Sequence, residues 1–248
     1  MTSPRLLPMG DAAWTLELGQ AIDPEVNARC HMLARQLSAS FTARGVAGVT
    51  DIVPTFRSVT VHFDPLQVDA AQIESELLRL AQPASAAAQT ERQWRLPVCF
   101  GGQHGLDLAT VAQQAGMAEG ALIDLLTATP LRVYAMGFMP GFAYMAELPK
   151  PLQLPRRATP RTGVAAQTLA IANGMACVYP WQSPGGWHLL GHMPIDLFDL
   201  REPDAPALLR AGDEVVFEAV DANHAAQLRT AQRQDPRFRQ RFLQVSRA

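Results

Sequence analysis

Hydrophobic positions in the first third of the chain repeat with two different spacings, which predict two kinds of element. Residues 24–42 repeat at helical spacing after Asp23, a residue type that caps helices, and residues 70–81 repeat in the same way. Alternation of apolar and polar side chains predicts strands within residues 5–20, 49–56 and 58–64. The order strand, helix, strand, strand, helix predicts a small α+β domain over residues 1–84, similar to a ferredoxin-like fold.

The pattern changes after a stretch of small and polar residues at 85–92, which we interpret as a linker. Residues 94–100 alternate as a strand, and two short helices follow, the first of which Asp107 can cap. From Arg132 onward, short apolar runs alternate with proline and glycine turns. The predicted strands in this part are residues 132–138, 168–173, 176–181, 187–192, 195–200 and 214–220. Many short strands of this kind indicate a β-barrel or β-sandwich domain, over residues 93–228.

The last residues, 229–248, are polar and rich in arginine. Pro236 ends the helical pattern there, because proline lacks a backbone N–H and clashes with the preceding turn. Clustered arginines can bind anions, but a charged run of this type is more often a solvated surface. We therefore expect a frayed, polar C-terminal tail.

Composition narrows the class of protein. The 248 residues are 48% hydrophobic and 18% charged, which is typical of a globular protein. A formal net charge of -2 does not favour nucleic-acid binding, and no apolar run approaches the roughly 18 residues that span a membrane. The three cysteines are far apart, so we expect buried thiols in a reducing compartment. The first residues do not have the pattern of a signal peptide, and we expect a cytoplasmic location.

Two stretches are unusually rich in glycine, proline and aromatic residues: GFMPGFAY at 137–144 and YPWQSPGGWHLLGH at 179–192. They lie in a segment, residues 131–194, with five lysine or arginine residues and one acid. Arginine presents a planar fork that matches carboxylate or phosphate oxygens. Arg156 and Arg161 each follow a proline that restricts the backbone. This segment is therefore a candidate site for an anionic group.

The candidate site residues form two groups. Those expected to bind the substrate or another anion are Arg156, Arg161, Ser183, Gly185 and Gly186. Those expected to line a pocket are Phe138, Pro140, Gly141, Phe142, Tyr144, Tyr179 and Trp187. The two adjacent glycines can adopt positive φ, so that consecutive N–H groups converge on an anion. An equally physical alternative is that the glycines form barrel corners and the aromatic residues fill a core.

Other chemistry has little support in the sequence. His188 and His192 are four residues apart, but no third ligand type lies nearby, so we expect no metal site. The sequence assigns no residue to proton transfer or nucleophilic attack, since it contains none of the common catalytic motifs.

Several motifs together resemble one known family. They are GFMPGFAYM, PRRATPRTGVAA, VYPWQSPGGWHLLG and PxxLFDL, preceded by LPVCFGG and GLDL near the start of the second domain. In this order they resemble the allophanate hydrolase subunit 1 family, which includes the B-type subunit of 5-oxoprolinase and KipI. The resemblance covers about residues 12–225 and is more specific than any single motif.

The resemblance implies a small α+β domain followed by a cyclophilin-like β-barrel. It implies a subunit of an ATP-dependent 5-oxoprolinase-type amidohydrolase that cleaves 5-oxoproline to glutamate and is inactive alone. The implied cofactor is Mg-dependent ATP, bound through the complex. The implied partners are an allophanate hydrolase subunit 2-like protein, which corresponds to the C-type subunit of 5-oxoprolinase, and a lactam-utilisation subunit.

Three places depart from the family's pattern. Leu126 stands where the resemblance leads us to expect a histidine, VAAQTL at 164–169 replaces VPAGSV, and His192 replaces an arginine. The departures leave two alternatives open: a non-catalytic, KipI-like inhibitor of a sensor histidine kinase, and a carboxyltransferase component acting on urea-derived substrates. The latter would need a partner to supply the biotin-dependent segments. The enzyme subunit is our main hypothesis.

Overall fold

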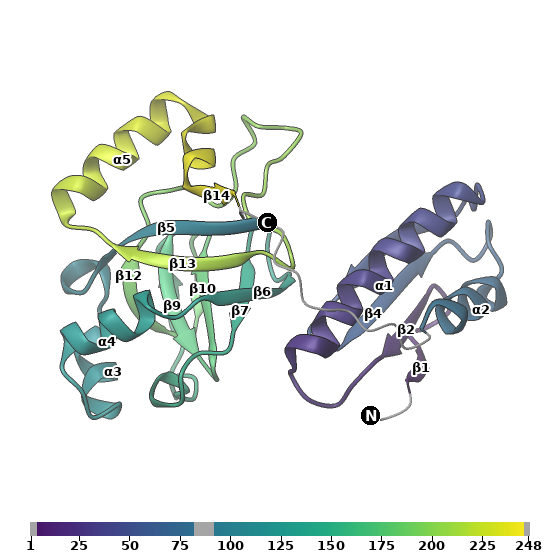
Figure 1. Cartoon of the computed structure of the whole chain (residues 1–248), viewed down its shortest axis with the longest axis horizontal. Coiled ribbons are helices and arrows are strands. Elements are labelled where there is room, and N and C mark those ends of the chain that lie inside the picture. The colour runs from purple at the N-terminus through teal and green to yellow at the C-terminus, as the bar shows by residue number, and fades with distance from the viewer. Residues whose placement is uncertain (1–3, 82–91, 246–248) are drawn as a thin grey trace. The chain divides into compact units, whose positions relative to one another are not determined.

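The computed structural model describes residues 4–81 and 92–245, which belong to two compact units, Met1–Gln89 and Thr90–Ala248 (Figure 1). Most of the predicted linker, residues 85–91, lies outside the described residues. Within the two described ranges, no helix is both long and apolar enough to cross a membrane.

The first unit is a four-stranded sheet covered by two helices. Its elements are β1 (Arg5–Pro8), β2 (Ala13–Glu17), α1 (Pro24–Ala43), β3 (Val49–Pro54), β4 (Ser58–Phe63) and α2 (Ala70–Leu80). The strand order is β1-β2-β4-β3, and all neighbours are antiparallel. β2 and β3, which α1 connects, lie on either side of β4, as in the split β-α-β unit of ferredoxin-like folds. The predicted fold is therefore confirmed, with β1 as the fourth strand.

Helix α1 begins where the sequence predicts. The Asp23 side chain accepts hydrogen bonds from the backbone N–H groups of Glu25 and Val26, at 2.9 and 3.0 Å. These bonds cap the first turn. The buried face of the helix, which includes Cys30 and Leu33, packs on the sheet in one apolar core.

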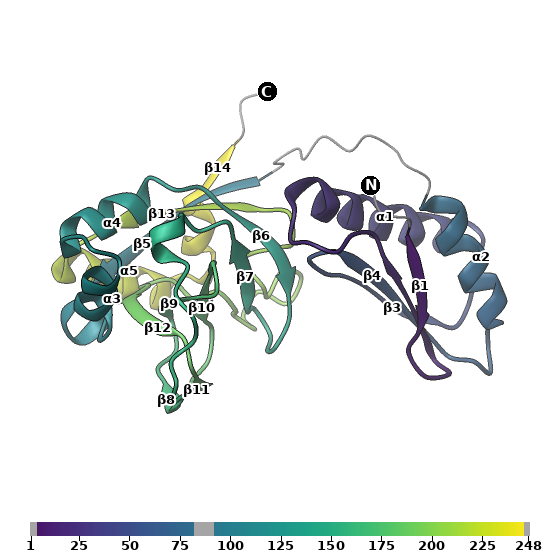
Figure 2. The ribbon, with the colours of Figure 1, turned by 90° about the horizontal axis from the view of Figure 1, so that it is seen from below.

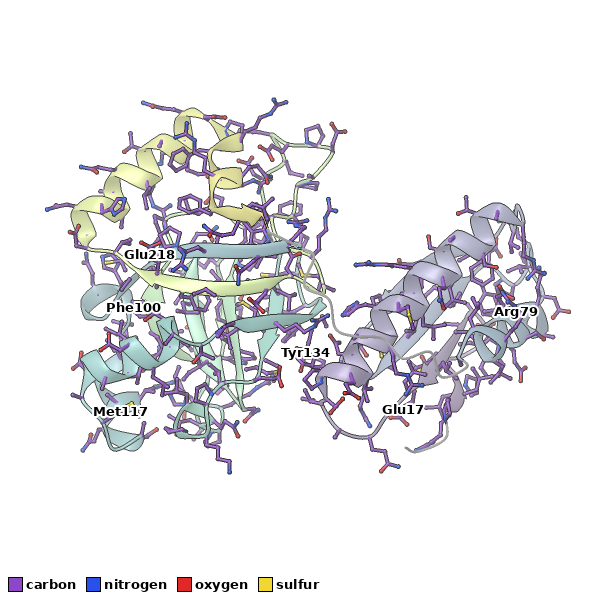
Figure 3. All side chains as sticks on the ribbon, viewed as in Figure 1. Glu17, Arg79, Phe100, Met117, Tyr134 and Glu218 are labelled. Atoms are coloured by element: carbon purple, nitrogen blue, oxygen red, sulfur yellow. The ribbon has the colours of Figure 1, made fainter. Side chains whose placement is uncertain are left out.

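A buried carboxylate connects the two helices of this unit. Glu76 of α2 accepts a hydrogen bond from Arg79 Nε at 2.8 Å and another from the Ser40 hydroxyl of α1. Arg44 Nη1 lies 3.1 Å from the same carboxylate, and Figure 3 labels Arg79 on α2. The hydrogen bond from Arg79 lowers the pKa of Glu76 to about 2, against the opposing effect of burial.

The second unit is a closed barrel with helices around it. Its strands and α-helices are β5 (Arg92–Phe100), α3 (Leu108–Gln114), α4 (Glu119–Thr127), β6 (Leu131–Met136), β7 (Ala143–Ala146), β8 (Arg161–Val164), β9 (Thr168–Ala172), β10 (Met175–Tyr179), β11 (Ser183–Gly185), β12 (His188–His192), β13 (Glu214–Ala219), α5 (Ala222–Gln234) and β14 (Leu243–Val245). Among the described residues, seven strands follow the order β12-β9-β10-β7-β6-β13-β5, and β12 pairs with β5 to close the ring. The expected α+β chain with a β-barrel domain is confirmed.

Alternate residues of one barrel strand pack into two different cores. Leu169 and Ile171 of β9 belong to the large core, which also contains side chains of α3 and α4. Ala170 and Ala172 belong to a smaller core on the other face of the strand, because side chains alternate along a strand. Val164 of β8 joins this smaller core, and β8 and β11 form a two-stranded ribbon that extends from the barrel (Figure 2).

Two segments of the second unit differ from their predicted structure. Residues 195–200 do not form a strand: only an isolated bridge joins Phe198 to Ala207. The expected frayed tail is instead ordered through residue 245, where β14 pairs with β5 beyond α5. The fully buried Arg239 holds it, donating hydrogen bonds to main-chain carbonyl groups and forming an ion pair at 3.1 Å with Glu202. The helix does end just before the proline at 236, as predicted.

Candidate functional site

Aromatic side chains from the two unusual stretches meet in the smaller core. The Phe142 ring lies at the centre, with ring centroids 4.8 Å from Tyr144, 5.5 Å from Tyr179 and 6.4 Å from Trp187. Phe138 adds a fifth ring, 5.3 Å from Phe142. All four contacts are edge-to-face, an arrangement that stabilises aromatic pairs beyond simple burial. The structure therefore brings these five predicted pocket residues into one aromatic cluster.

Phe138 is the exposed member of the aromatic cluster. Its side chain is 65% exposed and its backbone has a φ of 68°. A bulky residue with positive φ is strained, and such strain concentrates at functional sites. Hydrogen bonds from Met139 N to Gly137 O (2.8 Å) and from Phe142 N to Met139 O (3.0 Å) hold the turn. The loop thus presents an aromatic ring to solvent at a conformational cost.

The rest of this loop is fixed by close packing. Gly141 has a φ of 81°, and a Cβ at this position would lie 2.7 Å from the Phe198 side chain. The Pro140 carbonyl accepts a hydrogen bond from Trp181 Nε1 at 3.2 Å. Only glycine fits at 141, because both the backbone conformation and the space exclude a side chain.

Arg156 supplies a cation next to the aromatic cluster. Its guanidinium carbon lies 5.9 Å from the centroid of the Trp187 ring, which is within range of a cation–π interaction. The side chain is exposed, and no ion pair between described residues includes it. Arg156 is therefore free to bind an anion from solution.

The hydroxyl and thiol groups near Arg156 are neutral. Burial raises the pKa of the Tyr144 hydroxyl, and the nearby Arg156 charge opposes this effect only in part. Burial also raises the pKa of Tyr179 and of the Cys177 thiol below the rings. None of these three groups is poised to transfer a proton near neutral pH. The arrangement suits binding of a small carboxylate against an aromatic surface.

Arg161 does not have the role that the sequence predicted. Its two terminal nitrogens lie 2.7 and 2.9 Å from the two oxygens of Asp107, and Arg157 Nη1 lies 3.0 Å from the same carboxylate. Arg161 therefore binds an anion that belongs to the protein. Asp107 is only 4% exposed and also accepts a hydrogen bond from Leu189 N at 2.8 Å.

The electrostatics of Asp107 follow from these contacts. Burial raises the pKa of this carboxyl, but the hydrogen bonds from Arg161 and the Leu189 amide outweigh it, so the pKa lies below its ordinary value. The sequence predicts that Asp107 caps α3, yet its side chain makes no capping hydrogen bond. The sequence signal related to this role is the excess of basic residues over acids at 131–194, which does not identify Asp107 as the partner.

The predicted backbone anion site is not formed. Among the described glycines, those with positive φ do not include Gly185 or Gly186. Gly185 is required for another reason: a Cβ there would lie 2.9 Å from Tyr179 Cζ and closer still to its hydroxyl. The Gly186 carbonyl accepts a hydrogen bond from Arg157 N, and Ser183 Oγ lies 3.3 Å from the neighbouring Pro184 carbonyl. These residues build the β8–β11 ribbon over the aromatic cluster.

The three positions that depart from the family's pattern lie in different structural environments. Leu126 is fully buried in the large core, so this change affects packing. His192 packs against Arg229 and His104, and burial together with these neighbours lowers its pKa to about 4. Gln167 has a φ of 61°, which explains why the family motif has glycine at this position.

Among the described residues, no three His, Cys, Asp or Glu side chains lie close enough together to hold a metal ion. The two histidines considered in the sequence have other neighbours. His188 Nε2 lies 2.9 Å from the Pro155 carbonyl, and the ring of His192 lies beside Arg229. The three cysteines are free and buried, as predicted.

The sequence is similar to those of known proteins over most of its length. It matches the family described as carboxyltransferase domain, subdomain C and D, over residues 4–209. The B-type subunit of 5-oxoprolinase from Bacillus subtilis (strain 168) is 34% identical over 221 residues, covering 84% of this chain and 90% of that protein.

Solved structures show the same fold. The crystal structure of TTHA0988 superposes with a TM-score of 0.73 at 32% identity, covering 85% of this chain. This chain spans 40% of that protein. The urea amidolyase of K. lactis superposes with a TM-score of 0.74 at 19% identity, covering 90% of this chain and 15% of that protein, which shows a shared fold alone.

Proposed function

Since the chain belongs to the allophanate hydrolase subunit 1 family, together with the B-type subunit of 5-oxoprolinase, we propose that it has the same place in a 5-oxoprolinase-type complex. The complex would cleave the lactam of 5-oxoproline to glutamate with ATP. Its other members would be an allophanate hydrolase subunit 2-like protein and a lactam-utilisation subunit. A cytoplasmic location is part of this proposal.

The observation that supports this role best is the free Arg156 above the aromatic cluster. 5-Oxoproline has one carboxylate on a small lactam ring with an apolar methylene edge. Arg156 would bind the carboxylate with its guanidinium fork, and the half-buried Tyr144 and exposed Phe138 would contact the ring. The chain would thus orient the substrate, while the partner completes the site.

The described residues do not fit ATP. Of the basic residues near the site, Arg157 and Arg161 already bind Asp107, and the predicted glycine pair does not form an anion-binding loop. We therefore propose that the nucleotide binds chiefly to the subunit 2-like partner.

The test is ATP turnover by this chain co-expressed with its subunit 2-like partner and the lactam-utilisation subunit. We expect ADP release that depends on 5-oxoproline and falls about tenfold or more in Arg156→Gln, mainly through a higher KM for 5-oxoproline. The matched control is Arg95→Gln, an exposed arginine on β5. A stable complex without 5-oxoproline-dependent turnover would reject the proposed reaction, and equal effects of the two variants would reject the role of Arg156.

A further inference from the structure

A cavity adjoins the loop at 137–142, where Gly141 packs against Phe198 of the cavity lining. It has a volume of about 360 Å³ and shares no lining residue with the aromatic cluster. Trp181 and Phe198 form its apolar wall, with ring centroids 5.9 Å apart. Its polar lining includes Gln167, Asp196 and Arg229. This volume is within the range of small-molecule sites.

Four charged side chains line the cavity, and two of them, Asp196 and Arg229, do not form an ion pair with each other. Asp196 and Arg229 are both half-buried, and neither takes part in an ion pair among the described residues. Arg229 donates to the Met193 carbonyl at 3.2 Å and lies beside the His192 ring. By contrast, the other two charged lining residues, Asp199 and Arg201, are paired with each other at 2.6 Å.

Gln167 adds an unsatisfied acceptor to the same cavity. Its side-chain N–H₂ donates to Asp196 Oδ1 at 3.2 Å and to the Pro180 carbonyl at 3.4 Å. Its Oε1 is buried and accepts no hydrogen bond from a described residue, although the side chain is only 5% exposed. A buried polar atom without a partner is costly, and the positive φ of this residue adds strain. These two costs occur together at Gln167 alone among the residues that line the cavity.

We propose that this cavity binds a free α-amino acid with an apolar side chain. The Asp196 carboxylate and Gln167 Oε1 accept hydrogen bonds from its ammonium group, and Arg229 binds its carboxylate. The side chain packs against Trp181 and Phe198. A zwitterion is the ligand that satisfies both charges and the free acceptor together. This inference goes beyond the proposed reaction, because 5-oxoproline has no ammonium group.

The experiment measures binding of an amino acid to the full chain. Calorimetry and tryptophan fluorescence are the two readouts, the latter because Trp181 lines the cavity. The probe is L-leucine. N-acetyl-L-leucine lacks the ammonium charge, L-leucine amide lacks the carboxylate, and 5-oxoproline lacks the ammonium. We expect saturable binding of L-leucine, with affinity about tenfold or more weaker for each of the other three compounds. No binding of L-leucine at up to about 10 mM, or equal binding of the N-acetyl form, would overturn the proposal.

Two variants separate binding from folding. Arg229→Gln should weaken L-leucine binding about tenfold or more, whereas Arg233→Gln, an exposed arginine on the same helix, should not. Gln167→Gly removes the amide and also relieves the positive φ, so it should fold as well as the parent while losing affinity. Unchanged affinity in Gln167→Gly or in Arg229→Gln would overturn the assignment. Loss of ATP turnover in the complex would not affect this result, so the two proposals fail separately.

Discussion

Arg161 and Asp107, 54 residues apart in the chain, form a two-point ion pair at 2.7 and 2.9 Å that joins β8 to the segment before α3. The same carboxylate accepts hydrogen bonds from Arg157 and from the Leu189 amide. One buried acid therefore ties together the ribbon that covers the aromatic cluster, the loop before it and strand β12. Asp107 thus neutralises part of the excess positive charge of residues 131–194. Arg156, next to the aromatic cluster, forms no ion pair among the described residues.

Replacing this acid should destabilise the second unit. Asp107→Asn keeps the shape of the side chain but leaves Arg157 and Arg161 without a counter-charge. We expect a loss of about 3 kcal/mol in the free energy of unfolding, since removal of one partner of a buried pair leaves an uncompensated charge. Urea denaturation at pH 7 measures the loss. Asp204→Asn, at an exposed position, is the control, and a change as small as in that control would contradict the prediction.

The first unit should have an acid-sensitive contact at Glu76. The pKa of this carboxyl is about 2 in the folded chain, below its ordinary value of 4.5, chiefly because of the hydrogen bond from Arg79. A lowered pKa means that the stabilisation is fully present above pH 4.5 and is lost as the pH falls toward 2.

Comparison of the parent with Glu76→Gln tests this pH dependence. The variant should be less stable than the parent at pH 7, and the difference should shrink as the pH falls from 4.5 toward 2. Thermal unfolding across this range, followed by circular dichroism, measures it. A difference that stays constant with pH would show that the ionised carboxylate does not stabilise the unit.

Sequence periodicity predicted the elements well where one face of an element is buried. Helix α1 and strand β9 agree with their predictions within one residue, because burial of a single helical face or a short apolar strand is encoded locally. Residues 195–200 also form a short apolar run, but strand pairing depends on a neighbouring strand, which the sequence does not specify. The ordered tail depends on Arg239, whose partners are carbonyl groups brought close only by folding.

The candidate site shows the same limit. The aromatic residues could be grouped from composition, since two rare stretches lie close together in a barrel. Which arginines form ion pairs within the protein could not be predicted, because their partner, Asp107, comes from outside the basic segment. Residue type indicated anion binding, and only the tertiary structure separates Arg156 from Arg161.

Phe138 should contribute to binding of the subunit 2-like partner. Its ring is 65% exposed and is held in a strained backbone conformation, which suits an aromatic anchor at an interface. Phe138→Ala should weaken the complex by about 2 kcal/mol, measured by calorimetry with the purified partner. Leu106→Ala is the control, since Leu106 is 62% exposed in the same unit. Equal affinities for the two variants would place the interface elsewhere.

The β8–β11 ribbon offers a matched pair of glycines for a test of its packing. A Cβ at Gly185 would lie 2.9 Å from Tyr179 Cζ and closer to the hydroxyl, and Tyr179 is only 2% exposed, so its ring has little room to move. Gly185→Ala should therefore cost about 1–3 kcal/mol, the usual range for overpacking. At Gly163 on the facing strand, the nearest atom to a Cβ is Gln182 Nε2 at 3.6 Å, so Gly163→Ala should change the stability little. Urea denaturation of both variants, monitored by tryptophan fluorescence, measures the difference. Equal stability of the two variants would show that Tyr179 can leave its place in the aromatic cluster without cost, and the cluster would then be too loosely packed to orient a ligand.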